Sequence, residues 1–514
     1  MKAQDYKISS EKFVFAGTGN NIHDKKLETK PISYFRDAMN RFAKNKGSIL
    51  AAIIIMVLIL FALIAPLFTP YSVAYSDQYY AFALPRNELF VKMGINFWDG
   101  SETKEINESS LTLYNAIEEE IGREVIKGEA VKVEKETMGK VKIVYKARID
   151  TYNAVGAKFI LLTQKEFKAL QEYQNANNIQ VILPITALSD RPQASQDQSN
   201  ANYWFKTKVG DGLKTEIVYD ENGELVPAYK LYTGEDGYNS LRVEGNTPKY
   251  EYAVMKQGSY EVRVDYREYY IYYHTQILKD GINKPSFLLG TNDVGKDLFT
   301  CLANGARFSF VLAVLVAVVN LFVGAIYGAI EGYYGGKADL IMERVCDILS
   351  SIPFMIVITL LKYHLKASHV LVLFISFFLT GWIGMAARTR MQFYRFKNQE
   401  YVLVARTLGA KDSRIMFKHI FPNAIGTLIT GSVLVIPSVI FSETSLSYLG
   451  IIDLNTSSIT SVGTLLAKGQ DHLFTHPHMI VWPAIFISLL MLSFNLFGNG
   501  LRDAFNPSLR GTEE

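Results

Sequence analysis

Seven residues of this chain match the spacing of a phosphate-binding loop. The segment 290–296, GTNDVGK, places two glycines and a lysine where such a loop would surround the phosphates of a nucleotide. However, Asp297 stands where a serine or threonine would bind magnesium, and Asp293 would put a negative charge beside the phosphates. The motif counts only between a strand and a helix. We therefore expect no nucleotide binding here and no ATPase activity in this chain.

Other candidates for chemistry are few. His472, His476 and His478 are grouped near the end of the sequence, but without the ligand spacing of a zinc site. No combination of residues indicates hydrolysis, so we expect neither a metal site nor an enzyme. The two cysteines, Cys301 and Cys346, lie on either side of an apolar run that we expect to cross a membrane, which argues against a disulfide between them.

Four ionisable residues lie in or near apolar runs, namely Asp347, Lys362, His364 and Glu443. Charged groups are costly in lipid, so each is by default a candidate for function. Helix packing at the membrane edge could equally explain Asp347 and Glu443, and Lys362 could extend its ammonium group to the interface. Because both explanations stay open, no substrate-binding residue is assigned.

The elements that carry these residues are mostly apolar helices. Six runs are long enough to cross the hydrocarbon as helices, and they are residues 48–68, 308–330, 348–365, 370–387, 424–441 and 479–496. The first follows a long polar tail, which predicts an anchor and not a signal peptide. The formal net charge of +3 over 514 residues is too small to indicate nucleic-acid binding. The sequence therefore predicts an α-helical polytopic membrane protein with six transmembrane helices.

The lysines and arginines predict the orientation of these helices. Eight basic residues lie from Arg388 to Lys418, between the fourth and fifth spans, whereas Lys468 is accompanied by Asp453 and Asp471 between the fifth and sixth. Positive charge is enriched in cytoplasmic connections. We therefore expect the 388–418 segment and both termini in the cytoplasm, and residues 71–286 outside.

Residues 71–286 form a polar, tyrosine-rich insert between the first two spans. Alternating residues predict a hairpin over 131–149 around Met138-Gly139, and strands over 158–162, 179–183, 215–219, 225–232 and 259–273. Turns are predicted at Asn222-Gly223 and Asp236-Gly237, a polar loop over 191–201, and a helix after the capping box Thr163–Glu166. The insert should thus be a soluble α+β domain.

The tyrosines of segment 267–274, REYYIYYH, predict sheet surface and core, with a binding face as the alternative. The predicted domains are a cytoplasmic tail (1–46, with one amphipathic helix over 34–42), the first transmembrane helix (47–70), the extracellular insert (71–286), the membrane core (287–510) and a short tail (511–514). The core would include a cytoplasmic loop over 395–423. The insert could dock a soluble protein, cover the outer mouth, or contact a similar domain.

Within that loop, residues 400–423 predict two helices joined at an angle, and we call them the basic elbow. Tyr401–Leu408 can form two helical turns, which Gly409 ends because glycine tolerates left-handed geometry. Asp412 or Ser413 can cap a second helix, and Pro422 would close it and open the next span. An elbow exposed at a membrane surface is suited to bind a soluble partner.

The basic elbow resembles the EAA loop of permeases in bacterial ABC importers. In that loop a glycine follows the last alanine by four residues and a hydrophobic residue with proline closes it, as Ala405, Gly409, Phe421 and Pro422 do here. The usual Glu-Ala pair before the alanine is replaced by Leu403-Val404.

The resemblance extends along the membrane core. Residues 287–310 are similar to the segment before the second span in the C-type permeases of oligopeptide and dipeptide importers, although Phe287 and Lys296 replace the family's histidine and arginine. Further similarity lies in Gly332–Gly336, Asp339, Arg344, Asp347, Ile352-Pro353, Glu443, Leu446–Gly450 and Asn495–Arg510. The insert is not part of the family's usual pattern.

The resemblance implies a permease subunit of an ATP-driven ABC importer that moves oligopeptides or dipeptides across a bacterial plasma (inner) membrane. Its implied partners are a second, B-type permease in a heterodimer, two ATPase subunits that hold ATP and Mg, an extracellular substrate-binding protein and the lipid bilayer. This chain would hold no cofactor itself. The implied ATPase-coupling residues are Val404, Ala405, Arg406, Gly409, Ala410, Ile415, His419, Phe421 and Pro422.

Two alternatives stay open. The same type of permease could carry nickel or another small solute. Alternatively, the chain could be a membrane-anchored receptor or adhesion protein that acts through its insert, although six spans and the basic elbow exceed what an anchor needs.

Overall fold

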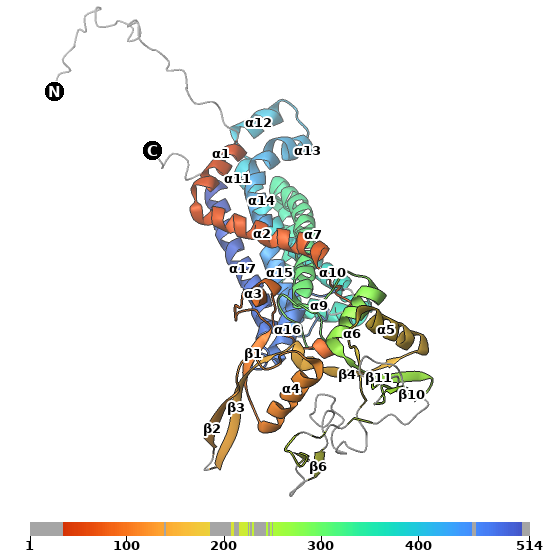
Figure 1. Cartoon of the computed structure of the whole chain (residues 1–514). Helices are drawn as coiled ribbons and strands as arrows, with labels where there is room; N and C mark the ends of the chain where they lie inside the picture. The colour runs from red at the N-terminus through yellow and green to blue at the C-terminus, as the bar shows by residue number, and fades with distance from the viewer. Residues whose placement is uncertain are drawn as a thin grey trace, which may run out of the picture.

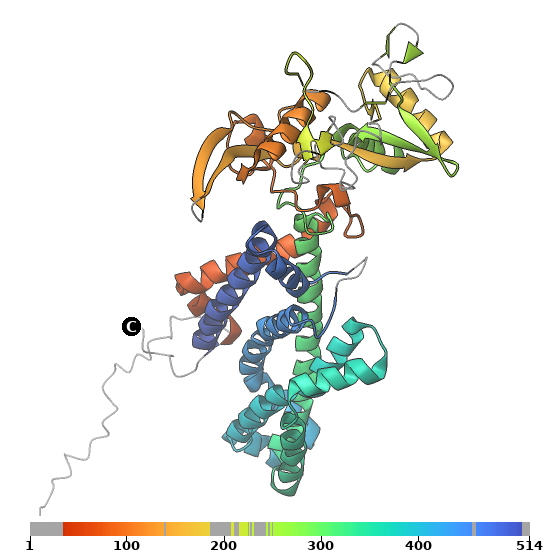
Figure 2. The same cartoon turned by 90° about the horizontal axis from the view of Figure 1, so that it is seen from below.

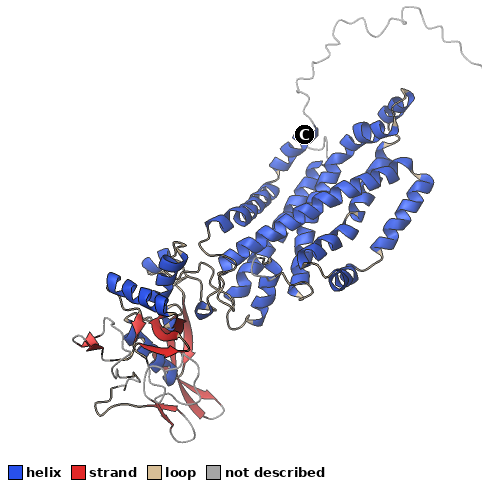
Figure 3. Ribbon diagram, turned by 90° about the vertical axis from the view of Figure 1, so that its right-hand side faces the viewer, coloured by secondary structure: helices blue, strands red, loops and turns tan. Residues whose placement is uncertain are grey.

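The computed structural model consists of a helical bundle and a domain that contains every described strand (Figure 1). It describes residues 34–505 apart from 138–139, 186–206, 210–214, 225, 227–228, 231–242, 245–246, 249 and 455–458. Figure 3 shows the strands confined to one end of the molecule, beyond the long helices. The predicted combination of a helical membrane protein with an α+β insert is confirmed.

Five helical segments are long and apolar enough to cross a membrane. They are α2 (Lys46–Phe68), α7 (Leu298–Tyr334), α10 with α11 (His369–Gly381 and Ile383–Phe396), the segment Asp412–Tyr448 and α17 (His478–Phe505). The segment 412–448 comprises α13 (Asp412–Arg414), the π-helix η8 (Ile415–Ile420), α14 (Phe421–Val433) and α15 (Val435–Tyr448). Helices α1 (Tyr34–Lys44), α12 (Glu400–Thr407) and α16 (Val462–Asp471) are shorter.

The third predicted span differs from a single straight helix. It comprises the end of α8 (Gly336–Ser350) and all of α9 (Phe354–Leu365), which are bent by 73° at the break before Phe354. Pro353 causes the break, because it has no amide hydrogen and disfavours helical geometry in the residue before it. The 12 residues of α9 cover only about 18 Å, so α9 can cross a membrane only together with α8.

Two contacts hold the end of the bent pair and the start of the next helix at one end of the bundle. Lys362 of α9 donates to the carbonyl of Ile451, and His369 at the start of α10 contacts the carbonyl of Asp453. Both carbonyls lie in the connection after α15, at the end of the bundle that faces the insert. Counted as one span, the bent pair brings the number of apolar segments that could cross a membrane to six. Helix α1 packs against the end of α17 through Ala38, Phe42 and Leu501. Helix α1 and the C-terminal end of α17 both lie at the end of the bundle that carries the basic elbow (Figure 1).

Helix α7 organises the bundle and packs most extensively on α11. Gly324, Gly328 and Gly332 allow this close packing, because a Cβ atom at any of the three would overlap the α11 backbone or its first side-chain atoms. The overlap is most severe at Gly328, which lies against the carbonyl of Ala386.

Two of the buried cores in the described part of the insert each lie between a helix and a sheet. One lies between α4 (Glu108–Ile121) and the sheet β1 (Ser101–Ile106), β3 (Lys140–Asp150) and β2 (Val131–Thr137). The second lies between α5 (Gln164–Asn177) and the sheet β10 (Ala253–Lys256), β11 (Ser259–Asp265) and β4 (Ala157–Leu162), with β5 (Ile182–Leu183) beside β11. Neighbouring strands are antiparallel. Figure 2 shows this domain as a separate layer beside the bundle.

Smaller elements complete the insert. They are η2 (Gln78–Tyr80), α3 (Glu88–Lys92), η3 (Asn153–Val155), the strand pairs β6 (Thr207–Val209) with β7 (Thr215–Ile217) and β8 (Val243–Glu244) with β9 (Thr247–Pro248), α6 (Tyr266–Tyr272) and the π-helix η7 (Tyr273–Leu278). The hairpin over 131–149, the strands near 158, 182 and 215, the helix with its Thr163–Glu166 capping box and the turn at Gly223 are confirmed. Residues 138–139, 191–201 and 236–237, and most of 225–232, lie outside the described residues.

The prediction of a strand over the whole of 259–273 is wrong. Strand β11 ends at Asp265, whose carboxylate accepts a hydrogen bond from the amide of Arg267 and so caps α6. The aromatic residues that favoured a strand instead lie on a helix, where Tyr266, Tyr270 and Tyr272 are buried. Burial in a shared core compensates for the weak helix propensity of tyrosine.

The segment that matches a phosphate loop is a packed joint between the insert and α7. Thr291 accepts from the amide of Ala83 and donates to the carbonyl of Tyr80, and Gly295 lies against the backbone of Asp77 with φ +74°. Asp297 caps α7 by accepting from the amide of Thr300, and burial raises the pKa of this carboxyl to about 6. The glycines here allow one backbone to approach another.

Candidate functional site

The basic elbow lies at the end of the bundle opposite the insert (Figure 1). As predicted, Gly409 ends α12, and its φ of +78° is the left-handed geometry that glycine accepts most readily. The predicted caps of the next helix are wrong. Lys411 occupies the capping position and makes no side-chain cap bond. The Asp412 carboxylate does not cap the helix and instead accepts a hydrogen bond from the Tyr333 hydroxyl at 2.6 Å.

Pro422 does not end the second helix, contrary to the prediction. The helical segment continues from Asp412 through Pro422 to Tyr448. The π-helix η8 immediately precedes the proline, and the side-chain amide of Asn423 donates to the carbonyl of His419 at 2.7 Å. Proline is tolerated in a helix when the backbone widens and side chains satisfy the freed carbonyls. The second helix of the basic elbow is thus a continuous extension of the fifth crossing.

A buried cluster holds the basic elbow against α7 and α11. Its members are Ala329, Tyr333, Phe393, Val402, Ile415, Met416 and Ile420. Tyr333 joins the two helices of the elbow, because its hydroxyl donates to Asp412 and lies 3.4 Å from a guanidinium nitrogen of Arg406. The elbow and α7 therefore form one packed unit.

The nine predicted coupling residues differ in their exposure and fall into three groups. Val404, Arg406, Gly409 and Pro422 are exposed; Ala405, Ala410, His419 and Phe421 are half-buried; and Ile415 is fully buried. Ile415 therefore supports the elbow from inside and offers no surface to a partner. Leu408 was not singled out from the sequence, although it is 82% exposed at the tip. The sequence did offer a signal for an exposed apolar residue at the tip, because the apolar side chain of Leu408 stands directly before the glycine that ends the helix.

The four ionisable residues have different surroundings. Asp347 is exposed and pairs with Arg344 at 2.8 Å, and His364 contacts the carbonyl of Leu360 on its own helix. The ammonium group of Lys362 donates to Ile451, as described above. Glu443 is fully buried, and its carboxylate accepts from Ser309 at 2.9 Å and from Ser447 at 3.0 Å. Glu443 therefore joins α15 to α7.

Replacement of Glu443 by alanine is expected to destabilise the bundle by about 2–5 kcal/mol, because it leaves two buried hydroxyls without their acceptor and opens a cavity. The temperature at which a thiol reagent begins to label the buried Cys301 during heating would measure this loss of stability. Ser445→Ala is the matched control, because the Ser445 hydroxyl bonds only to the carbonyl of Phe441 on its own helix. Equal labelling temperatures for the two variants would contradict the assigned role.

The three histidines serve different contacts at the base of the insert. His476 stacks on Phe82 with ring centroids 4.2 Å apart, His472 contacts the same ring edge-on, and His478 contacts the carbonyl of Thr291. Burial lowers the pKa of His476, which keeps its ring neutral near pH 7. In the described part of the chain, no group of three metal-ligating side chains comes together.

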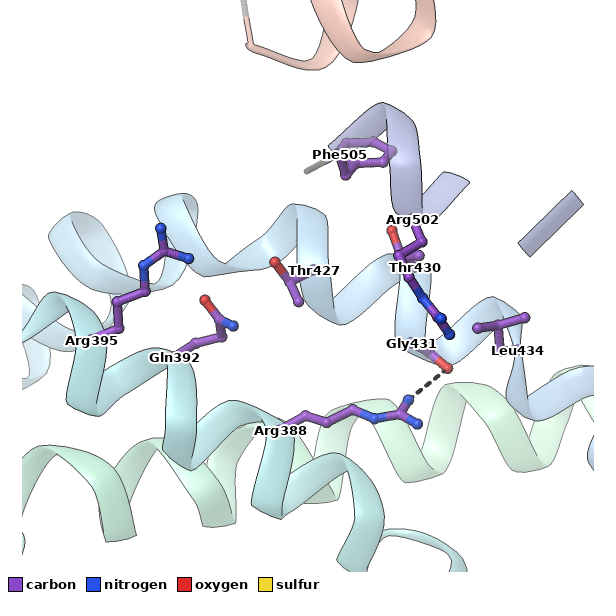
Figure 4. Close-up of a pocket in the computed structure, with 9 residues that line it drawn as sticks. All are labelled: Arg388, Gln392, Arg395, Thr427, Thr430, Gly431, Leu434, Arg502 and Phe505. Atoms are coloured by element: carbon purple, nitrogen blue, oxygen red, sulfur yellow. Dashed lines mark hydrogen bonds between the residues drawn. The ribbon is translucent and has the colours of Figure 1, made fainter. Parts of the chain in front are cut away.

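Two adjoining cavities open along α14 and α15. The one nearer the elbow has a volume of about 360 Å³ and is lined by Arg388, Arg395, Thr430 and Arg502, among others (Figure 4). The other, of about 430 Å³, is lined by Asn320, Thr380, Ser438 and Ser442 among others. Arg388, Gly431 and Leu434 line both cavities. Cavities of this size are typical of small-molecule sites.

Comparison with known proteins identifies the helical part of the chain. The family described as "binding-protein-dependent transport system inner membrane component" matches residues 321–511, and the "N-terminal TM domain of oligopeptide transport permease C" matches residues 33–85. The oligopeptide transport system permease protein OppC of Bacillus subtilis is 43% identical over 221 residues, which are 43% of this chain and 72% of the relative. This chain belongs to the permease family of binding-protein-dependent transport systems.

Two further relatives are also permease proteins of peptide transport systems. The dipeptide transport system permease protein DppC of Bacillus subtilis is 38% identical over 222 residues, covering 43% of this chain and 68% of the relative. OppC of Haemophilus influenzae is 38% identical over 222 residues, covering 43% of this chain and 70% of the relative. The resemblance to C-type peptide permeases is thereby confirmed. The two family matches leave residues 86–320 of this permease outside them, and this stretch contains most of the insert.

Neither Arg388, which lines both cavities, nor Asn320, which lines one of them, was predicted as a site residue from the sequence. Arg388 was counted only for orientation, although an arginine two turns before the basic end of an apolar helix is itself a signal of function. Asn320 was an equally visible signal, as the amide side chain within the apolar run 308–330. Their proximity could not be predicted, because it depends on how α7, α11 and α14 pack together.

Proposed function

We propose that this permease moves oligopeptides or dipeptides into the cell and is driven by separate ATPase subunits that bind the basic elbow. The family and the names of its relatives support the transport of peptides. The observation that carries the proposed coupling is the exposed apolar surface of the elbow. Leu408, Val404 and Phe417 are 82%, 55% and 50% exposed, at the end of the bundle opposite the insert.

Exposed apolar side chains on a structure that is itself held by a buried core are typical of a protein-binding surface. The exposed arginines and lysines of the elbow would add electrostatic attraction to an acidic partner. ATP and Mg would be bound by the partner subunits. ATP-driven movement of those subunits would displace the elbow, and Tyr333 and the buried cluster would pass the displacement to α7 and α11 as a rigid-body rotation.

The remaining partners follow from the same proposal. A B-type permease would complete a heterodimer around the path of the peptide, and an extracellular substrate-binding protein would deliver it. The elbow and both termini would then be cytoplasmic, with residues 71–286 outside. ATP-dependent peptide uptake by the purified complex in proteoliposomes tests the function, and no uptake under any ATP concentration would contradict it.

Site-directed labelling tests the orientation. In a Cys346→Ser background, a membrane-impermeant maleimide added to intact cells is expected to label Glu172→Cys on α5 of the insert. Lys411→Cys in the elbow should react only after the membrane is opened. Both positions are exposed in the structure, so burial would not explain a failure to react. Labelling of Lys411→Cys in intact cells would refute the proposed orientation and with it the coupling role.

A further inference from the structure

The two cavities along α14 and α15 adjoin and form one groove in the membrane part of the permease, lined by polar as well as apolar side chains. We call it the arginine groove and define it by Asn320, Thr380, Arg388, Gly431, Ser442 and Arg502. It begins near the elbow, where Arg395 and Arg502 line it, and continues past Arg388 to Asn320. Three of the helices that surround it, α7, α11 and α14, also pack together.

The arginines of the groove lack anionic partners in the described part of the chain. No carboxylate lies within ion-pair distance of Arg388, Arg395 or Arg502, whereas nearby Arg390 pairs with Asp339 and Glu343. Arg388 donates to the carbonyl of Gly431 at 3.2 Å, and a Cβ atom at Gly431 would lie 2.7 Å from the same guanidinium nitrogen. Figure 4 shows the guanidinium groups of Arg388 and Arg502 both directed toward Gly431 and Leu434.

At the end of the groove that lies farther from the elbow, the side-chain amide of Asn320 lacks one of its hydrogen-bond partners. Asn320 is 2% exposed, and its side-chain oxygen has no hydrogen-bond partner among the described residues. A Cβ atom at Gly381 would overlap the nitrogen of the same amide, so the glycine keeps this part of the cavity open. A buried polar atom left unpaired costs about 1–3 kcal/mol unless a ligand or water satisfies it.

We propose that the arginine groove binds the peptide during transport, with Arg388 pairing with its C-terminal carboxylate and Asn320 bonding to its backbone. This inference rests on the proposed function. A planar guanidinium matches a carboxylate in a two-pronged hydrogen bond. A free carboxyl terminus and backbone amides occur in every peptide regardless of sequence, so recognition of these groups suits a transporter of many peptides.

The test uses the complete transporter in proteoliposomes of neutral lipid and an alanine tripeptide, supplied either with a free carboxyl terminus or as its C-terminal amide. The wild-type transporter should take up the free acid at least about tenfold faster than the amide, as expected for a charge-assisted pair. Arg388→Gln should remove this preference by slowing uptake of the acid alone, and Arg388→Lys should retain part of it. Unchanged uptake of the amide shows that the variant is folded.

Arg344→Gln is the matched control, because it removes an arginine from the membrane core at an exposed site outside the groove. It should leave the preference for the free acid intact. Equal slowing of acid and amide by Arg388→Gln would overturn the inference while leaving peptide transport established. An effect of Arg388→Gln that appears only with anionic lipid would overturn it too, by identifying a lipid headgroup as the ligand. A wild-type transporter that moves neither peptide would instead refute the proposed function.

Discussion

Gly328→Ala is expected to lower the thermal stability of the purified permease sharply, although it adds only one methyl group. The added Cβ atom would overlap the carbonyl of Ala386, which belongs to the α11 backbone and cannot rotate away. Helices α7 and α11 would have to separate, and such overpacking costs about 1–3 kcal/mol or more. Because the same helices support the basic elbow, uptake should fall together with stability.

Gly384→Ala provides the matched control for this prediction. Gly384 lies on α11, and no atom lies within 4 Å of a Cβ atom added there. The same chemical change in the same pair of helices should therefore leave the unfolding temperature and the uptake of peptide unchanged. Identical unfolding temperatures for the two variants would show that the close contact of α7 with α11 does not stabilise the bundle.

Gly409→Asp is expected to abolish uptake, with a loss of at least about tenfold, while membrane insertion stays normal. A side chain at residue 409 would point into open space, so the fold tolerates it. The left-handed geometry at φ +78° costs a residue other than glycine about 1–2 kcal/mol. The larger effect comes from a carboxylate placed beside the exposed Leu408, at the surface where we propose that the ATPase binds.

Gly409→Asn separates these two effects, because asparagine carries the same backbone cost without the charge. It should retain most of the uptake and still co-purify with the ATPase subunits, whereas Gly409→Asp should not. If the aspartate variant transports peptide at the wild-type rate, the elbow is not the coupling surface. If both variants fail equally, backbone geometry and not charge controls the contact.

The membrane architecture was predictable because long apolar runs have few alternatives to a lipid-spanning helix. The spans followed from this pattern, and the amphipathic helix predicted over 34–42 corresponds to α1. The bend at Pro353 and the continuation through Pro422 did not, since a proline can either break a helix or be accommodated by a widened turn. Which outcome occurs depends on side chains such as Asn423 that satisfy the freed carbonyls.

The helix α6 was missed because aromatic residues favour strands in general. The pattern Asp265-x-x-Glu268 was an available signal for a helix start, and Asp265 does cap α6. The site was harder to predict. Whether Ile415 is buried and Leu408 exposed depends on the contact of the elbow with α7, and the arginine groove combines residues separated by more than 180 positions in the sequence.

Helix α7 extends without interruption over 37 residues, or roughly 55 Å. The joint at Thr291 and Gly295 fixes one end to the insert, and Tyr333 fixes the other end to the basic elbow. Free-energy coupling between two sites acts equally in both directions. Any protein that binds the insert and displaces α7 must therefore change the affinity of the elbow for a partner bound there, and that partner must change the affinity of the insert for the first protein by the same factor.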